Sequence, residues 1–421
     1  MDQLPNELLL KVLAFLDGAS LVRCKRVCKQ WQIVVTAILT HGKALWRLMC
    51  LSEIDRNVVA ELQSQRYLER DRDGPELDWF KTYRSWYCSS AVSKSPHSSC
   101  EYSTTSRGEV TCLKASGDLI VTGHVSGFVV MWHAQSGEAL FEVQQTGGAI
   151  ADIALLCLRN FGTLPWGHLG CVHSHMVCAP QTLQLQVYRL ESDCRKVHAF
   201  ATSYPVTSLK ACGDLLATLS TRRCLVVVMR VTRLGENLRF QQLLRIPNQM
   251  GICSWIGISH SFVMFVGPRW EAGKVSLDAR RSWKWGLAPP EWRAHRHVMH
   301  ALVQRRGFVV ISTVDMRLYV SMDECHDLYE IKAARDWNSR ASALALWGEL
   351  LVIGLESGRL YVFYMREDSL DDLASRQADW SEQLGTDPII NIDVTSDPRT
   401  SRPTLVAATR HKLHVITWPV H

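Results

Sequence analysis

The sequence predicts a multidomain protein in which a small all-α module and a helical linker precede an all-β propeller of seven blades. Apolar residues recur at helical spacing within residues 4–46. A Ser/Thr-rich run changes the composition at residues 89–106. Beyond residue 110, short alternating strands repeat at a nearly constant period. With 421 residues, 47% of them apolar, the chain is long enough for two or three globular domains.

The N-terminal module is expected to hold three short helices. Pro5 suits the first turn of the first helix, because its missing N–H would be unpaired there, and Asp17-Gly18 ends that helix. The apolar face of this helix is formed by Leu8, Val12, Phe15 and Leu16. The second helix carries Leu21, Cys24 and Val27, and the third carries Trp31, Val34, Val35 and Ile38. Helices this short bury little surface by themselves, which predicts a permanent partner.

The order of residues in this stretch resembles the F-box, the adaptor-binding module of ubiquitin ligase substrate receptors. The matching positions are Leu4-Pro5, Glu7-Leu8, Val12, Phe15-Leu16, Leu21, Cys24, Val27-Cys28, Trp31 and Leu45-Trp46. The resemblance implies that a Skp1-type adaptor binds Leu4, Pro5, Leu8, Val12, Leu21, Val27 and Trp31. An ordinary apolar helix pair would use the same residues as core, and we expect several of them to serve both purposes.

A helical linker is expected between the two domains. Trp79, Tyr83 and Trp86 lie at i, i+4 and i+7 and share one helix face. This segment is similar to the helix that often joins an F-box to its C-terminal domain. Because a Ser/Thr-rich run is typical of a linker, we divide the chain into residues 1–48, 49–97 and 98–421.

The propeller prediction depends on a unit of four short strands that begins at Val110. The unit returns near residues 206 and 341, and weaker copies begin near residues 150, 252, 298 and 389. Successive starts are 40 to 56 residues apart, close to the period of about 40–50 residues of a propeller blade. The last unit lacks a fourth strand, which residues near 100–106 can supply, removing an open sheet edge.

The repeat resembles a degenerate WD40 repeat. Trp132 keeps the tryptophan of the family, but His133 follows it where the family has aspartate. No Gly-His dipeptide lies between blades where the family places one. The Asp–His–Ser–Trp network of strong WD40 blades is therefore not expected in its usual form.

Composition excludes several classes of protein. The net charge of +6 is modest for this length and argues against a dedicated nucleic-acid binder. The 14 cysteines are scattered without a Cys-x-x-Cys pair, and the N-terminus has no basic segment before its first apolar run. Since no stretch reaches the roughly 20 apolar residues of a membrane span, we expect no membrane partner and a cytoplasmic or nuclear protein with reduced thiols.

The sequence predicts neither catalytic residues nor a cofactor. It contains no nucleophile motif and no phosphate-cradling Gly-Lys loop. The segment from Cys171 through His173 and His175 to Cys178 is the most zinc-like cluster, and His295 to His300 is a second. A structural zinc site normally adds a distant ligand pair, so a strand of an irregular second blade is the preferred interpretation and no metal is predicted.

Basic residues recur in the turns between the second and third strands of the units. These turns contain His124, Arg222, Arg223, Arg269, Arg317, Arg359 and Arg410-His411-Lys412. If the turns share one face, Arg222, Arg223, Arg269, Arg317, Arg359 and Arg410 are candidates for binding an acidic or phosphorylated protein segment. The alternative is that they are solvated turn residues, which are often charged.

The combined resemblance implies a non-catalytic substrate receptor of a cullin-RING ubiquitin ligase. The F-box would bind the adaptor, the propeller would hold a target protein, and the cullin-RING assembly would supply the charged ubiquitin-conjugating enzyme. Because the motif starts at residue 4, without the dimerising helices of some relatives, one copy per complex is expected. Two alternatives remain: an adaptor-bound scaffold without ligase activity, and a nucleic-acid reader whose affinity would fall steeply with salt.

Overall fold

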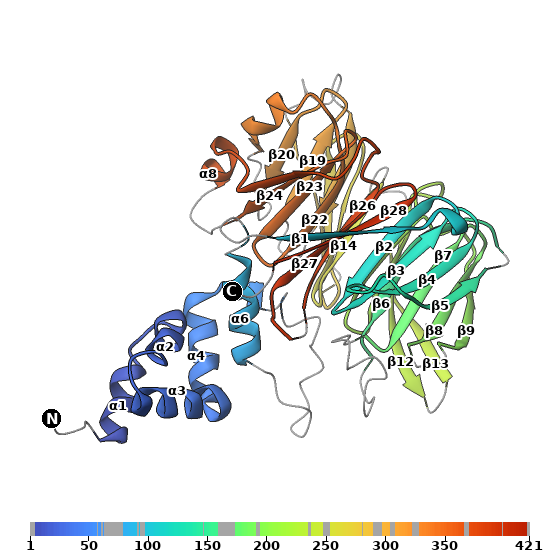
Figure 1. Ribbon diagram of the computed structural model, residues 1–421. Coiled ribbons are helices and arrows are strands. Elements are labelled where there is room, and N and C mark those ends of the chain that lie inside the picture. Colours follow the sequence, from blue (N-terminus) through green and yellow to red (C-terminus); the bar gives the residue numbers. More distant parts are fainter. Residues whose placement is uncertain are drawn as a thin grey trace.

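The computed structural model describes residues 5–56, 58–59, 62, 79–90, 92, 97–145, 147–158, 173–190, 194–234, 237–246, 253–279, 281–288, 297–303, 308–321, 328–365, 370–397 and 399–418. In Figure 1 a cluster of N-terminal helices lies beside a large β domain. The helices are α1 (Asn6–Leu13), α2 (Gly18–Cys24), α3 (Lys29–His41), α4 (Lys43–Glu53) and α6 (Trp79–Ser89).

The helical module packs around a core that differs from the predicted one in its first helix. Leu9 and Leu13 of α1 are buried, whereas Leu8 and Val12 are exposed. The rest of the core comes from all the other helices: Leu21, Val34, Val35, Ile38, Trp46, Met49, Cys50, Ile54 and Tyr83. Helix α2 ends at Cys24, so Val27 lies in the connection to α3.

Two carboxylates fix how the helices meet. Asp17 caps α2, because its Oδ1 accepts the Ser20 N–H at 2.8 Å. Glu53, at the end of α4, accepts the Gly18 N–H at 3.0 Å and the Tyr83 hydroxyl at 2.5 Å. Burial, followed by this bond to Glu53, raises the pKa of Tyr83. Glu53 therefore joins α2, α4 and α6.

Among the described helices, no single one is long and apolar enough to cross a membrane. Only α3 and α4 taken together reach that length and hydropathy, and they are bent by 82°.

The β domain is a ring of seven four-stranded antiparallel sheets, as predicted. We name the strands of each blade a to d from the central channel outward. Blade 1 holds β2 (Val110–Ser116), β3 (Leu119–His124), β4 (Phe128–His133) and β5 (Ala139–Gln144); blade 2 holds β6 (Ile150–Leu156), β7 (His175–Pro180), β8 (Gln184–Arg189) and β9 (Lys196–Ala201); blade 3 holds β10 (Ser208–Cys212), β11 (Leu215–Ser220), β12 (Leu225–Leu234) and β13 (Asn237–Ile246); blade 4 holds β14 (Trp255–Ile258), β15 (Phe262–Val266), β16 (Glu271–Ser276) and β17 (Ser282–Gly286).

The remaining blades complete the ring. Blade 5 holds β18 (Val298–Val303), β19 (Val309–Thr313), β20 (Leu318–Ser321) and β21 (Tyr329–Glu330); blade 6 holds β22 (Ala341–Trp347), β23 (Leu350–Leu355), β24 (Arg359–Tyr364) and β25 (Trp380–Gln383); blade 7 holds β26 (Asn391–Ser396), β27 (Pro403–Ala408), β28 (Lys412–Thr417) and β1 (Ser98–Ser103). Short helices η1 (Thr105–Arg107), η4 (Lys332–Asp336) and α8 (Leu370–Ser375) lie in connections. Strand b is buried at every residue in six blades, which explains its continuous apolar runs.

The ring closes as predicted, by pairing the first strand with the last. Strand β1 runs antiparallel to β28, with Ser98 opposite Thr417 and Ser103 opposite Lys412. It spans residues 98–103, slightly before the expected 100–106. The Tyr102 hydroxyl also reaches blade 1, donating to the carbonyl oxygens of Ala134 and Gln135 at 3.0 and 2.9 Å.

The helical module is attached to blades 6 and 7 through a shared apolar cluster. Leu62 and Val92, with Val58 and Trp86, pack against residues of both blades, among them Trp347. At the a–b turn of blade 6, Gly348 has a φ of +57° and lies against Leu62 and Val58, where a larger side chain would be strained. Arg84 of α6 donates to the Arg399 carbonyl, in the a–b turn of blade 7, at 3.5 Å. The helices therefore meet the end of the propeller that carries the a–b turns.

Removing β1 should destabilise the propeller. A chain that begins at residue 104 leaves β28 as an open edge and loses the packing of Tyr102, so we expect its free energy of unfolding to fall by about 3 kcal/mol or more. Urea unfolding compares it with a chain that begins at residue 98. A third chain, beginning at residue 92, controls for the new terminus. Equal midpoints for all three would show that β1 is not needed for closure.

Candidate protein-interaction surfaces

The helical module exposes an apolar surface on α1 and on the α2–α3 connection. Leu8, Val12, Phe15 and Val27 are 47%, 50%, 91% and 62% exposed. Pro5 is exposed, and Trp31 is half-buried and packs against the core of the module. Several large apolar side chains exposed on so small a module mark an interaction site. We call these residues the α1 face.

Of the seven residues predicted to contact the adaptor, five lie on the α1 face and two, Leu21 and Leu4, are not among the residues that define it. Leu21 is fully buried in the core of the helical module, so it packs the helices and offers no surface to a partner. That part of the prediction is corrected. Leu4 lies outside the described residues. The other five lie on the α1 face, where their role stays a prediction.

Three further apolar side chains that the sequence pattern did not single out are exposed: Ile33 on α3, and Leu48 and Leu51 on α4. These side chains are 68%, 65% and 42% exposed. Leu48 and Leu51 are three residues apart, so they share one side of α4, away from the buried Trp46 and Met49. The three-residue spacing was visible in the sequence, but in a helix with apolar residues on several sides it did not separate surface from core.

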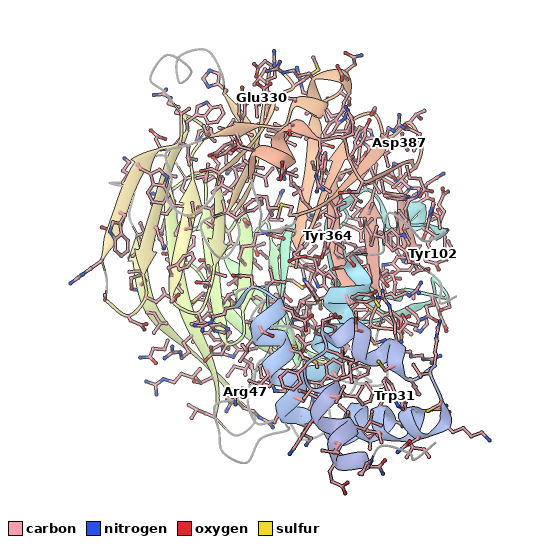
Figure 2. All side chains as sticks on the ribbon, turned by 90° about the vertical axis from the view of Figure 1, so that its left-hand side faces the viewer. Trp31, Arg47, Tyr102, Glu330, Tyr364 and Asp387 are labelled. Carbon is pink, nitrogen blue, oxygen red and sulfur yellow. The ribbon has the colours of Figure 1, made fainter. Side chains whose placement is uncertain are left out.

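The six predicted arginines lie at the end of the propeller opposite the helices. Because neighbouring strands are antiparallel, b–c turns lie at the other end of each blade from a–b turns, where the helices attach. Figure 2 shows Glu330 and Asp387 at one end of the molecule and Trp31 and Arg47 at the other. The arginines occur in or directly after the b–c turns of blades 3 to 7. We call this end the b–c face.

Two of these arginines are already engaged. Arg317 forms an ion pair with Glu330, which also pairs with Arg335. The hydrogen bond from Arg335, followed by that from Arg317, lowers the pKa of Glu330. Arg359 lies over the ring of Tyr361, 5.5 Å from its centroid, and donates to the Ser381 hydroxyl at 3.3 Å. These contacts reduce what either arginine can offer to a ligand.

The other four, Arg222, Arg223, Arg269 and Arg410, are exposed. Among the described residues, none of the four has an ion-pair partner. The b–c face therefore keeps an excess of positive charge on blades 3, 4 and 7. Whether these residues bind a target stays a prediction.

His124 is not a surface residue, which corrects its assignment to the basic turns. It is fully buried, and burial lowers its pKa. The Trp132 indole N–H donates to Thr122 Oγ1 at 2.9 Å, and Thr122 lies 2.9 Å from His124 Nε2. His124 Nδ1 lies 3.1 Å from the Gly108 carbonyl oxygen. Since that oxygen only accepts, Nδ1 carries the proton and the Thr122 hydroxyl donates to Nε2.

Blades 2 and 3 brace the same region with different residues. In blade 2 the Gln145 amide donates to the Tyr188 hydroxyl at 2.6 Å, and Tyr188 donates to Gln186 at 3.0 Å. In blade 3 the Tyr204 and Thr218 hydroxyls are 3.0 Å apart. Each network joins a d–a connection to the strands of the blade that follows. The WD40 network is thus replaced by other residues in these blades.

The two His-rich segments form no metal cluster within the described residues. His173 Nδ1 lies 2.9 Å from the Ser116 hydroxyl, and His175 Nδ1 lies 3.0 Å from that of Ser174. Burial lowers the pKa of both histidines to about 4. Cys171 and His295 fall outside the described residues. His300 lines the central channel.

Comparisons with known proteins agree with both domains. A family model described as F-box-like matches residues 1–52. F-box/WD repeat-containing protein 7 of Drosophila melanogaster is 28% identical over 152 residues, which cover 34% of this chain and 11% of that protein. The crystal structure of the Cps50 (Swd1) β-propeller domain from Myceliophteria thermophila superposes with a TM-score of 0.54 at 13% identity, covering 77% of this chain and 100% of that chain.

These findings confirm an F-box-like domain at the N-terminus, homology to an F-box/WD repeat protein and a seven-bladed propeller. The matched segment spans about a tenth of the length of the Drosophila protein. The likeness to Cps50 shows the fold alone.

The Thr122 network yields a stability prediction. Thr122→Val keeps the shape of the side chain but leaves the Trp132 N–H and His124 Nε2 buried without their partner, so we expect a loss of about 1–3 kcal/mol. Thermal and urea unfolding measure the loss. The matched control, Thr182→Val in the b–c turn of blade 2, should change stability by less than about 0.5 kcal/mol. Similar values for the two variants would contradict a bracing role.

Proposed function

We propose that this chain is the substrate-recognition subunit of an SCF-type cullin-RING ubiquitin ligase. The helical module binds a Skp1-type adaptor, and the propeller holds a target protein for ubiquitination. The observation that carries the proposal is the α1 face, an apolar surface on an F-box-like domain joined to a propeller. The chain itself performs no chemical step and accelerates transfer by bringing the target close to the charged conjugating enzyme.

The joint between the domains supports this role. A receptor needs a fixed distance and direction between adaptor and target, since misplacement lowers the rate of transfer. Here Val58, Leu62 and Trp86 share one apolar cluster with blades 6 and 7. Such a continuous core makes relative motion costly, in contrast to a flexible linker. The b–c face then points away from the adaptor-binding end.

The charge of the b–c face favours an acidic or phosphorylated target segment. Arg222, Arg223, Arg269 and Arg410 project from three blades and are exposed. Each contact alone is worth little in water, but several guanidinium groups on one phosphate or carboxylate reinforce one another. Target capture at this face is a proposal that rests on placement and charge.

The second candidate is a scaffold that binds the adaptor without recruiting a cullin. Both functions use the α1 face, so adaptor binding does not separate them. Ubiquitin transfer to a bound target in a reconstituted complex does. We further propose that the protein acts in the cytoplasm or nucleus, where such ligases work, as one copy per complex.

The adaptor interface is tested by Leu8→Ala with Val12→Ala. Removing two central apolar contacts should weaken adaptor binding by about 2–4 kcal/mol, which is roughly 30- to 1,000-fold in Kd. Pull-down and calorimetry with purified adaptor provide the measurement. The matched control is Ile33→Ala with Leu48→Ala, which removes apolar groups that are more exposed than Leu8 and Val12 and lie on other helices of the module. If this control loses the adaptor while the first variant keeps it, the α1 face is not the adaptor site.

The target face is tested by Arg222→Glu with Arg410→Glu. Charge reversal in two blades should reduce capture of targets at least about tenfold, leave adaptor binding unchanged and act more strongly at low salt. The readout is quantitative mass spectrometry of proteins bound after proteasome inhibition. Arg195→Glu with Arg239→Glu, both exposed and close to the c–d turns of blades 2 and 3, makes the same charge change at the opposite end of the propeller. Equal capture by both double variants would place target recognition elsewhere.

A further inference from the structure

The centre of the propeller encloses a polar cavity of about 450 Å³. Strand a of every blade lines it. A cavity of this volume lies within the range of small-molecule sites, about 300–1,000 Å³. Its acidic, basic and imidazole side chains are Lys114, Asp152, His173, Lys210, His300 and Asp393. None of them belongs to the α1 face or the b–c face.

Both carboxylates that line the cavity accept hydrogen bonds from strand a of the next blade. Asp152 Oδ2 accepts the Ser208 hydroxyl at 2.9 Å and the Leu209 N–H at 2.8 Å. Asp393 Oδ2 accepts the Ala115 N–H at 2.9 Å and lies 3.7 Å from the Lys114 amine. Each aspartate thus holds strand a of the next blade. These bonds leave little capacity on either carboxylate for another cation.

Lys210 is the cation that lacks such a partner. Among the described residues, no carboxylate lies within ion-pair distance of its amine, and it makes no side-chain hydrogen bond. Burial and then the positive charge of Lys114 lower the pKa of Lys210, while the more distant carboxylates of Asp152 and Asp393 partly oppose this shift. The positive charge of Lys210 also acts on His300. Burial lowers the pKa of His300 to about 4, and repulsion from Lys210 contributes to this decrease. His300 is therefore neutral and can donate one ring N–H.

We propose that the central cavity is a binding site for a small phosphate-bearing anion, held by Lys210 with Lys114 and His300. An anion beside Lys210 supplies the direct ion pair that Asp152 and Asp393 do not make with it, and its several oxygens accept from two ammonium groups and a ring N–H at once. Ammonium groups bind phosphate as point charges, so no fork geometry is needed. The interaction is stronger than between the same groups in bulk water, because protein surrounds the cavity on the sides formed by the seven blades. The site is independent of adaptor and target binding.

A ligand in the central cavity would stabilise the closed ring of blades. Lys114 lies on blade 1, Lys210 on blade 3 and His300 on blade 5. A single anion at the centre therefore contacts blades that are distant in the sequence. Binding to the folded ring and not to the unfolded chain raises the stability of the folded state.

The experiment titrates the full chain with three probes: inorganic phosphate, pyrophosphate and inositol hexakisphosphate. Calorimetry in a phosphate-free buffer should show saturable binding of one molecule per chain for at least one probe, and the preferred probe distinguishes a free phosphate from a larger phosphorylated metabolite. Lys210→Met and Lys114→Met should each weaken that binding at least tenfold. The matched control, Lys332→Met, removes an exposed charge from η4 and should leave it unchanged.

A second measurement needs no variant. The rate at which an acetylating reagent modifies Lys210 can be measured by mass spectrometry. The probe that binds most tightly should slow this reaction at least fivefold, while the rate at Lys332 stays unchanged. The proposal is overturned if no probe binds saturably. It is also overturned if Lys210→Met binds as tightly as the natural chain, or if Lys210 and Lys332 are protected equally.

Discussion

The pairing of β1 with β28 is the constraint on which the rest of the molecule depends. It joins residues 98–103 to residues 412–417 and thereby turns seven separate sheets into a closed ring. The same pairing sets the position of the helices, because β1 follows α6 closely in the chain. Without the β1–β28 pairing, blade 7 would have no fixed position relative to α6. The contact of Arg84 with the a–b turn of that blade and the shared apolar cluster would then be lost. The helical module and the b–c face are therefore held in a fixed relative orientation by one strand pair.

Within the ring, buried polar side chains join neighbouring blades. The residue types differ between blades, but each set forms hydrogen bonds at the same place, between a d–a connection and the following blade. Thr122 with His124, Tyr188 with Gln145, and Thr218 with Tyr204 each satisfy polar atoms where a connection crosses onto the next blade. Near the channel, Asp152 and Asp393 accept backbone N–H groups of the following blade. A buried donor or acceptor must be paired, but which residue pairs it is free to change. This explains how the repeat keeps its fold after losing the usual WD40 residues.

The blade period and the closing strand were predictable because each blade meets the same burial requirement at a regular interval. Individual surfaces were harder to predict. Leu8 and Leu9 have identical side chains in a short helix that is apolar on most sides, and only tertiary packing decides that Leu9 enters the core. His124 is the last residue of β3 and precedes a turn, so the sequence pattern placed it in that turn, whereas the structure buries it and brings its ring to the Gly108 carbonyl oxygen. The pairing of Arg317 with Glu330 depends on two strands meeting, which no local pattern reveals.

The closing strand also sets the order in which the chain can fold as it is synthesised. Strand β1 leaves the ribosome early, and its partner β28 follows roughly 300 residues later. At about 5–20 residues per second, β1 waits on the order of 15–60 s before it can pair. An apolar strand left unpaired for so long would invite association with other nascent chains. Its sequence, Ser-Ser-Cys-Glu-Tyr-Ser, is almost entirely polar, and it lies at the outside of its blade with most residues still exposed. The strand that waits longest for its partner is therefore polar enough to remain solvated. This lowers the risk that nascent chains on one polysome associate through an unpaired strand.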